Sequence, residues 1–536
     1  MRRWNGWGDD GTDVPLSPAA QALIAGAIGA GHPSRDVTFE AVCAAVPPSR
    51  LAPHPLVDAG ASVRARHARG QGLPDLVALR SGAGLVFPDG VAQPSSAQEI
   101  EALVALAAER GFSLIPYGGG TSVTGHVNPL PGGPPVLTVS LARLDRLRHF
   151  DAASRLATFE PGITGPAIER QLGALGHRLG HYPQSFEYSS LGGWIATRSS
   201  GQQSRGYGRI EDLFAGGTVV TPAGTLRLPP FPASAAGPDL RHLVLGSEGR
   251  VGIVTEAVVR VSPLPEVERF EAVFLPDWDA ALLAARQLSQ SDVPLSMLRV
   301  STPRETATTL ALAARTRGGA TLERLLRWRG AREPDRCLAV LAFSGSARRV
   351  KGAREGAFDL LRPCRAVRLG GSRLGRAWQK SRFRAPYLRN TLWSMGYAVD
   401  TVETATTWTQ VPRTVDAVEG ALRGALVDEG ERIWTFTHLS HVYATGASVY
   451  TTFVFRTAGG AEATCERWTR LKAAASRAIV REGATITHQH GVGSDHAAYL
   501  EAEKGALGVR ALRRMIATFD ERGLLNPGKL LPPDAG

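Results

Sequence analysis

The chain has 536 residues, of which 43% are hydrophobic and 21% are charged, and its formal net charge is +12. This length exceeds one ordinary hydrophobic core, so we expect two large domains with terminal extensions. Its four cysteines lie far apart and form no C-x-x-C pair, which argues against a disulfide framework, a zinc ribbon or a dithiol redox centre.

The cellular location follows from what the sequence lacks. The start of the chain has charge but no apolar core of signal-peptide length, and no run reaches the roughly 18 uncharged apolar residues of a spanning helix. Together with the cysteine pattern, which suits a reducing compartment, this predicts a cytoplasmic protein.

Periodicity predicts the elements in chain order. The first 89 residues are rich in Ala, Pro and Gly, with a helical fragment at Pro18–Ile28, and an amphipathic helix is predicted over Ala97–Arg110. The elements expected next are strands at Val136–Leu141, Ala157–Phe159 and Ile253–Val261, a helix at Pro166–Leu175 and a hairpin at Val219–Gly224. After Pro263, long strand–helix units indicate a separate α+β substrate domain, followed by a helical tail from Glu466.

The most informative stretch is a short apolar run, Ile115–Tyr117, that leads into three glycines followed by Thr121 and Ser122. Glycine lets the backbone approach a ligand closely, so that successive N–H groups converge on an anion, and the hydroxyls add donors. The pattern predicts a cradle for a pyrophosphate. Taken alone, it is also typical of an ordinary turn after a strand.

Two further stretches, Pro183–Gly201 and Gly246–Glu256, follow the glycine run. In order and spacing the three together resemble the FAD-binding signature of the vanillyl-alcohol oxidase/p-cresol methylhydroxylase (PCMH) flavoprotein superfamily. The resemblance implies an α+β fold with a two-part PCMH-type FAD-binding domain and an α+β cap/substrate domain. The expected division is an N-terminal helical extension at 1–89, the FAD-binding domain at 90–265, the cap at 266–475 and a C-terminal helical segment closing the active site at 476–536.

Within that superfamily the chain resembles the alkyldihydroxyacetonephosphate synthases over nearly its full length. The likeness rests on Arg3–Gly8, on Tyr387–Arg389 followed by Glu403-Thr404, on Gly446–Tyr450 and on His488–Gly493. It implies an FAD-dependent, redox-neutral reaction of ether lipid synthesis, in which an acyl-dihydroxyacetone phosphate exchanges its acyl group for a fatty alcohol.

The resemblance also assigns site residues. Tyr450, His488 and His490 are placed at the reactive face of the flavin, with Arg389 and Arg299 as anchors for an anion. The expected FAD contacts are Pro116, Tyr117, Gly118, Gly119, Gly120, Thr121, Ser122, Gln184, Ser185, Phe186, Glu187, Tyr188, Ser189, Ser190, Thr197, Arg198, Ser199, Ser200, Glu248, Gly249, Arg250, Val251, Gly252, Ile253 and Val254.

Two positions depart from the family pattern. Gln489 stands where the family often has the middle of three histidines, and Ser494 stands where a lysine is common. Both departures bear on which group handles the proton and the phosphate.

The exchange needs a proton removed beside a carbonyl, an electron sink and a proton donor for the departing carboxylate. Oxidised flavin can be the sink, Tyr450 can relay the proton once desolvation or a neighbouring histidine tunes it, and an imidazole is the natural acid/base partner. Arg389 would hold a phosphate or carboxylate through its bidentate fork.

The alternatives are structural roles for the same residues. Tyr450 could be a packed aromatic, and Arg299 and Arg389 could be structural ion pairs. His488 and His490, if they lie on one strand, share a face and would suit a metal as well as acid/base chemistry. We assign no metal site.

The attachment of FAD follows from the glycine run. Covalent attachment in this superfamily uses a His, Cys or Tyr at the isoalloxazine, and the run carries neither His nor Cys. We therefore expect non-covalent FAD.

A second candidate is an FAD-dependent 2-hydroxyacid dehydrogenase of the D-lactate or glycolate type, which shares the ending Leu525–Lys529. Such enzymes commonly carry a His-x-Gly-Asp-Gly-Asn-x-His metal motif, and here Thr437–Tyr443 lacks its Gly-Asp-Gly-Asn core. His438 and His441 still leave a metal open at that strand.

Basic residues gather between Arg348 and Arg389, where thirteen Lys and Arg face two acidic residues. No nucleic-acid-binding motif accompanies them, so we expect an anionic small substrate or a lipid surface rather than nucleic acid; a merely solvated arginine-rich face is the alternative. A predicted helix at Thr321–Arg329 places Leu322, Leu325 and Leu326 on one face, which predicts peripheral membrane contact. Family resemblance further implies a homodimer.

Overall fold

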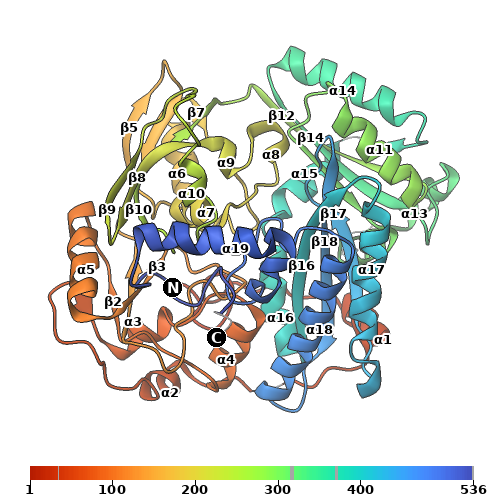
Figure 1. The fold of residues 1–536 in the computed structure, drawn as a ribbon. Coiled ribbons are helices and arrows are strands. Elements are labelled where there is room, and N and C mark those ends of the chain that lie inside the picture. Colours follow the sequence, from red (N-terminus) through yellow and green to blue (C-terminus); the bar gives the residue numbers. More distant parts are fainter. Residues whose placement is uncertain (34, 314–318, 369–371, 534–536) are drawn as a thin grey trace.

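The computed structural model describes residues 1–33, 35–313, 319–368 and 372–533, and within them three large β-sheets carry the fold. Figure 1 shows two sheets with their helices on one side of the molecule and the third sheet on the other. The long helix α19 (Leu500–Phe519) runs between the two sides.

The first sheet has the order β1-β2-β4-β3, with β2, β4 and β3 parallel. Its strands are β1 (Val57–Asp58), β2 (Gly90–Ala92), β3 (Ser113–Tyr117) and β4 (Val136–Ser140). The predicted amphipathic helix is confirmed as α5 (Ala97–Arg110), which begins after the N-cap Ser96 and ends at Gly111 in a left-handed conformation (φ 72°). Its apolar side is buried, and β3 then delivers the chain into the glycine run.

The second sheet is antiparallel, with the order β5-β6-β10-β8-β9. Its strands are β5 (Leu147–Asp151), β6 (Leu156–Phe159), β8 (Phe214–Thr221), β9 (Gly224–Leu228) and β10 (Ile253–Arg260), and β8 and β9 form the predicted hairpin. The helices of this part are α6 (Gly165–Gly173), α7 (Leu191–Thr197), α8 (Ser204–Tyr207), α9 (Ile210–Leu213) and α10 (Arg241–Val244), and a small ribbon pairs β7 (His177–Arg178) with β11 (Ser262–Pro263).

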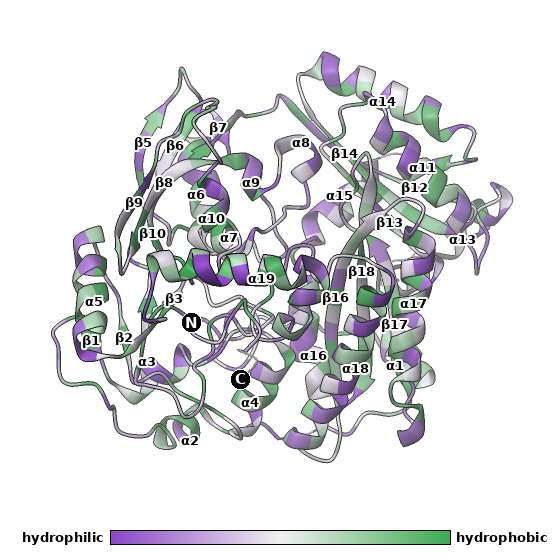
Figure 2. Cartoon of the chain, viewed as in Figure 1, coloured by the Kyte–Doolittle hydropathy of each residue, from purple (hydrophilic) through white to green (hydrophobic). Residues whose placement is uncertain are grey.

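The third sheet is antiparallel, with seven strands in the order β15-β12-β14-β13-β17-β18-β16. Its strands are β12 (Val267–Leu275), β13 (Met297–Ser301), β14 (Cys337–Gly345), β15 (Val367–Arg368), β16 (Tyr397–Thr407), β17 (Trp434–Leu439) and β18 (Gly446–Arg456). The helices that accompany it are α11 (Trp278–Gln290), α12 (Pro303–Ala313), α13 (Gly319–Trp328), α14 (Ala347–Leu361), α15 (Ser372–Ser381), α16 (Leu388–Ser394), α17 (Val411–Gly424) and α18 (Ala461–Arg481). Apolar residues concentrate on these buried strands, whereas α14 shows many hydrophilic positions (Figure 2).

Both ends of the chain join the two sides of the molecule. The helix α1 (Pro18–Ile28) lies with the third sheet, whereas α2 (Phe39–Ala44), α3 (Ala61–Arg66) and α4 (Leu73–Ser81) lead back to the first sheet (Figure 1). At the other end, Leu524 O accepts from Leu114 N at 2.9 Å, so the C-terminal segment returns to β3. The expected boundary at 475/476 falls inside α18, which continues to Arg481.

No helix within the described residues combines the length and the apolar character needed to cross a lipid bilayer.

The N-terminal segment is attached through Asn390 of α16. The Asn390 side chain is buried, accepts from Trp7 N at 3.1 Å and donates to Trp7 O at 2.8 Å. Asn390 therefore satisfies both backbone groups of a residue that is itself 4% exposed.

We predict that Asn390→Ala loosens the N-terminal segment, because each buried backbone group left unpaired costs about 1–3 kcal/mol. Limited trypsin digestion should then cleave at Arg2, Arg3 or Arg35 faster than in the parent chain. Ser394→Ala, an exposed position on the same helix, is the control. Equal cleavage rates in the parent and Asn390→Ala would contradict the assignment.

Candidate functional site

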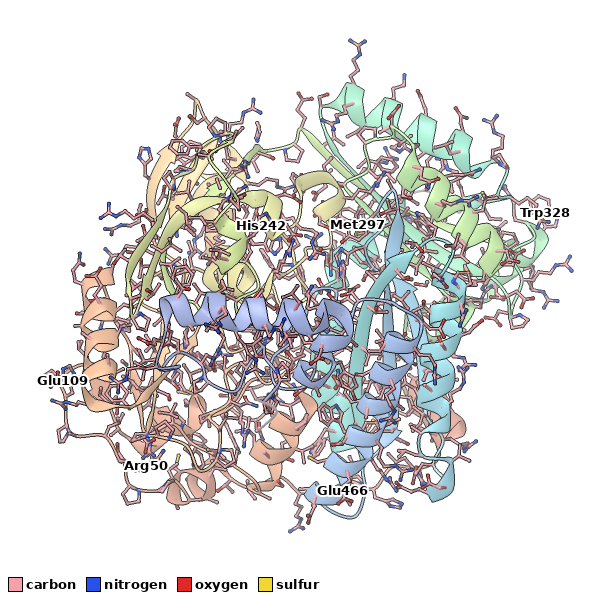
Figure 3. The ribbon with its side chains drawn as sticks, in the orientation of Figure 1. Arg50, Glu109, His242, Met297, Trp328 and Glu466 are labelled. Atoms are coloured by element: carbon pink, nitrogen blue, oxygen red, sulfur yellow. The ribbon has the colours of Figure 1, made fainter. Side chains whose placement is uncertain are left out.

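A cavity of about 550 Å³ lies between the glycine run, the segment 183–200 and the third sheet. The residues that line the cavity are polar in one part and apolar in another. One part is formed by backbone and hydroxyl groups of the glycine run and of α7, and another part by apolar side chains of α1, α16, β16, β17 and β18. Met297 of β13 also lines it and is labelled near the junction of the two sides (Figure 3).

The glycine run has the geometry of an anion cradle. Among the described residues, the amide N–H groups of residues 118–122 have no protein acceptor, although the run lines the cavity. A Cβ on Gly118 would collide with the Ser190 hydroxyl, and one on Gly119 with the Tyr188 carbonyl. Only glycine permits this approach, and the result is a row of free donors facing the cavity. This donor set fits the pyrophosphate of a dinucleotide.

Most of the predicted FAD contacts line this cavity, from all three sequence stretches. They are Pro116, Tyr117, Gly118, Gly119, Gly120, Thr121, Ser122, Gln184, Ser185, Ser189, Ser190, Thr197, Ser199, Ser200, Glu248, Gly249, Gly252, Ile253 and Val254.

The remaining predicted contacts lie outside the lining: Phe186, Glu187, Tyr188, Arg198, Arg250 and Val251. Phe186 stacks on Phe383 with ring centroids 5.2 Å apart, and Arg250 donates to two carbonyls of the C-terminal segment. A contiguous motif turns only some of its side chains toward one ligand, and the others hold neighbouring segments in place.

Glu248 links the cradle to the segment that carries the predicted histidines. It adopts a left-handed backbone (φ 55°), and its buried carboxylate accepts from the amides of Val492 (2.5 Å) and Gly493 (2.8 Å). The same carboxylate lies 3.1 Å from His126 Nε2, whose Nδ1 is 2.7 Å from the Ser122 hydroxyl. A chain of contacts therefore connects the glycine run with residues 491–493.

Glu403 of β16 is the centre of a second, buried cluster. Its Oε1 is 3.1 Å from His488 Nδ1 and accepts from the Ser440 hydroxyl at 3.1 Å, and its Oε2 is 3.7 Å from His490 Nε2. Burial alone would raise the pKa of Glu403, but the His488 hydrogen bond and the nearby imidazoles outweigh it and hold the pKa well below its usual range. The carboxylate therefore stays charged in a buried site.

His488 lies behind the cavity, not in its lining. Its Nε2 accepts from Arg209 Nη1 at 2.7 Å and is 2.6 Å from the Tyr443 hydroxyl. With Arg209 at Nε2, the ring proton sits on Nδ1 and is donated to Glu403. The structure thus places His488 as a support for Glu403, which differs from the expected position at the flavin face.

His490 and Gln489 do line the cavity. Residues 488–490 follow an irregular segment, so the expectation of two histidines on one strand is wrong. The bend sends His488 toward Arg209 while His490 faces the cavity. Burial lowers the pKa of His490 below 6.5 despite the opposing charge of Glu403. Its imidazole is therefore neutral at neutral pH and available as a base.

Tyr450 of β18 lines the cavity between two histidines. Its ring stacks on His438 (centroids 4.8 Å apart, 24° between planes) and meets His490 edge-on at 5.7 Å. Burial, with the charge of Glu403 next, raises the pKa of Tyr450 well above its usual range. Of the two expected influences on this phenol, desolvation favours its protonated form, and two neighbouring histidines contact its ring.

The two predicted arginines differ in what they can still bind. Arg299 is ion-paired with Glu305, which also contacts His438 Nδ1 at 2.8 Å. Arg389 donates Nη1 to the Gln71 carbonyl at 2.6 Å, while its buried Nη2 has no partner among the described residues. Burial lowers the pKa of Arg389. Both side chains line the cavity, and Arg389 retains a free donor for an anion.

Among the described residues, one group could hold a metal ion: Glu403, His441 and His488, whose ligand atoms lie within 4.8 Å of one another. His488 already binds the cation of Arg209, and a second positive charge there would be opposed. His438 and His441 do not converge, because His438 contacts Glu305 and His441 faces the hydroxyls of Ser200 and Ser204. The arrangement suits a hydrogen-bonded cluster.

Several site residues carried no sequence signal of their own role. Trp7, His126 and Asp400 line the cavity, and Arg209 and Glu403 set its electrostatics. Glu403 lies in the pair Glu403-Thr404, which is part of the resemblance to the synthase family. Its sequence neighbours do not indicate that its carboxylate contacts histidines more than 80 residues away.

Comparison with known proteins agrees with this geometry. A family model described as an FAD binding domain matches residues 88–228, and one described as the C-terminal domain of FAD linked oxidases matches residues 264–530. FAD is therefore the cofactor of this chain, and the free amides of the glycine run fit it.

Named relatives and a solved structure extend the likeness over the whole chain. An alkyldihydroxyacetonephosphate synthase of Dictyostelium discoideum is 32% identical over 88% of this chain and 77% of its own. One of Trypanosoma brucei brucei is 30% identical over 99% of this chain and 92% of its own. A solved alkyldihydroxyacetonephosphate synthase superimposes with a TM-score of 0.86 at 28% identity, covering 99% of each chain.

Gly119→Ala should abolish FAD binding, because the added Cβ would collide with the Tyr188 carbonyl and push the glycine run out of place. Gly133→Ala, where nothing lies within 4 Å of the added Cβ, is the matched control. Flavin absorbance per polypeptide after purification measures the outcome. Full FAD content in Gly119→Ala would overturn the cradle.

Non-covalent attachment is tested by denaturation in acid or heat, which should release all the FAD. The glycine run itself has no histidine, but among the described residues four histidines from other segments line the cavity: His126, His438, His441 and His490. Yellow colour that stays with the denatured polypeptide would contradict non-covalent binding, and each histidine could then be replaced in turn.

Proposed function

The chain belongs to the alkyldihydroxyacetonephosphate synthase family, and from that premise we propose that it makes the ether bond of ether lipids. An acyl-dihydroxyacetone phosphate would lose its fatty acid from C1 and gain a fatty alcohol there, with no net oxidation. The observation that carries the proposal is a single cavity that combines a cofactor cradle, a proton-handling cluster, a free arginine donor and an apolar part. Each of these four features meets one requirement of the exchange reaction.

The charged end of the substrate suits Arg389. Its buried Nη2 has no partner among the described residues, whereas Arg299 is already paired with Glu305. A phosphate would compensate the positive charge of the buried guanidinium and accept its free N–H. We propose that Arg389 binds the phosphate and that Arg299 positions Glu305 and, through it, His438.

The proton-handling groups divide into a base and a donor. FAD, when bound, would supply the electron-accepting centre that the exchange requires. His490, neutral because it is buried, accepts the proton lost beside the carbonyl, and Tyr450 holds its proton as a donor toward the departing carboxylate. Glu403 stabilises the imidazolium that forms at His490, since its Oε2 is 3.7 Å from His490 Nε2.

We also propose that the enzyme is a cytoplasmic homodimer that touches membranes at α13. The expected apolar face is only partly exposed: Leu326 is fully buried, and the side chain of Leu322 lies outside the described residues. Trp328 is 77% exposed and projects from the edge of the molecule (Figure 3), and Leu325 is 38% exposed. Exposed arginines surround them.

Light scattering after gel filtration would report the dimer.

We retain the domain division with one change. The FAD-binding domain is placed at 90–265, and the cap domain begins at 266 and extends to the end of α18 at Arg481 instead of residue 475. The extension 1–89 contributes β1 to the first sheet and α1 to the cap side.

The first test follows labelled fatty alcohol into alkyl-dihydroxyacetone phosphate, beside a 2-hydroxyacid panel with a dye acceptor. Tyr450→Phe should keep FAD and the fold but lose roughly 100- to 10,000-fold in exchange rate, the usual contribution of a general acid or base. Gln489→His should keep most of the rate. A Tyr450→Phe enzyme with nearly full rate would remove Tyr450 from the chemistry, and turnover confined to the 2-hydroxyacids would favour the dehydrogenase.

The pH dependence follows from His490. A base must be neutral, and its pKa is lowered from 6.5, so kcat/KM should fall only when the pH drops below 6.5 and should be flat from there to neutral pH. Measurement of kcat/KM between pH 5 and 8, at constant ionic strength, tests this. An acidic limb centred above 6.5 would mean that His490 is not the base.

If α13 contacts membranes, the protein should sediment with vesicles that contain anionic lipid. Salt should weaken this binding, because each nearby basic residue contributes about 1 kcal/mol of electrostatic attraction to the anionic surface. Trp328→Glu and Leu325→Glu should weaken binding with FAD content unchanged. Leu175→Glu, a change at a 43% exposed leucine beyond α6, is the control. Absence of sedimentation at low ionic strength would exclude membrane docking.

A further inference from the structure

Residues of the N-terminal segment line the apolar part of the cavity. Leu16 and Ile24 line it from one side, and Leu392, Trp434 and Phe436 line it from the third sheet and α16. Ile24 is 2% exposed and belongs to the same apolar cluster as Leu392. A segment close to the start of the chain thus lines the cavity together with residues of α16 and β17, and α1 lies with the third sheet in Figure 1.

This wall is held firmly at both ends. Before α1, the Thr391 hydroxyl donates to the Val14 carbonyl at 2.8 Å. After α1, the Tyr397 hydroxyl donates to Gly29 O at 2.8 Å and accepts from Gly31 N at 3.0 Å. The helix itself begins after the N-cap Ser17, whose hydroxyl accepts from Ala20 N. A wall tied down in this way resists displacement by a ligand that is too long.

The side chains on this wall are aliphatic, and no charged residue belongs to the cluster. The glycine run and Arg389 also line the cavity, and on β17 and β18 the pair His438 and Tyr450 lies four residues from the pair Trp434 and Val454. A ligand that spans both parts has a polar, anionic end and an unbranched apolar end, as a lipid does.

We propose that Ile24, together with Leu16, is the end stop for the alkyl chain and sets the chain length that the enzyme accepts. The proposal rests on the proposed function for the identity of the ligand. Each methylene that enters the apolar part strengthens binding roughly fourfold. The gain ends where the chain meets Ile24, because a packed wall does not yield to one more methylene.

The test measures binding without turnover. FAD-loaded enzyme is titrated with saturated fatty alcohols of increasing length in the absence of any acyl donor, and Kd is read from the perturbation of the flavin spectrum or by calorimetry. For the parent chain, affinity should rise with length and then level off or fall. Ile24→Ala should move this limit up by about three methylenes, because the substitution removes three side-chain carbons. Ile24→Phe should move it down.

The matched control is Leu23→Ala on the same helix, where the side chain is 39% exposed and the limit should not move. FAD content checks the fold of each variant. An unchanged limit in both Ile24 variants, or no gain in affinity with length in the parent chain, would overturn the proposal. A limit that moves as expected in an enzyme without exchange activity would uphold the end stop while rejecting the proposed function.

Discussion

The site depends on one buried charge, the carboxylate of Glu403. A buried carboxylate is tolerated only when hydrogen bonds and opposite charges compensate it. Here Ser440 and His488 bind it directly, and Arg209 supplies a formal positive charge on the far side of His488. Burial raises the pKa of Tyr450 and the charge of Glu403 adds to that effect, whereas burial lowers the pKa of His490 and the charge of Glu403 opposes it. One carboxylate therefore acts on both groups that line the cavity.

A second buried carboxylate, that of Glu248, couples this cluster to the cofactor. It binds the amides of Val492 and Gly493, two residues beyond His490, and it contacts His126 at the end of the glycine loop. Gly491 packs so closely on His126 and Glu248 that a Cβ there would collide with both. The cofactor cradle and the segment that carries His490 are therefore one connected structure, and displacement of one disturbs the other.

Local patterns in the sequence predicted local structure well. The helix Ala97–Arg110 was expected from its apolar period and its ends, and the glycine run was expected to expose its amides; both are found. Prediction failed where tertiary contacts determine the burial or the orientation of a side chain. Helical periodicity places Leu326 on the same face as Leu325, but Leu326 packs into the core. His488 turns toward Arg209 because residues 488–490 do not form a strand. The raised pKa of Tyr450 comes first from burial and next from Glu403, a strand partner that only the fold reveals.

The exchange that we propose for this enzyme proceeds without net oxidation. Anaerobic incubation of the FAD-loaded enzyme with an acyl-dihydroxyacetone phosphate and a fatty alcohol, with no electron acceptor present, tests it most directly when released fatty acid and flavin absorbance are followed together. The account predicts fatty acid and alkyl product in equal amounts over many turnovers, with the flavin oxidised at the end. Product limited to one equivalent per flavin, with the flavin left reduced until an acceptor is added, would contradict it.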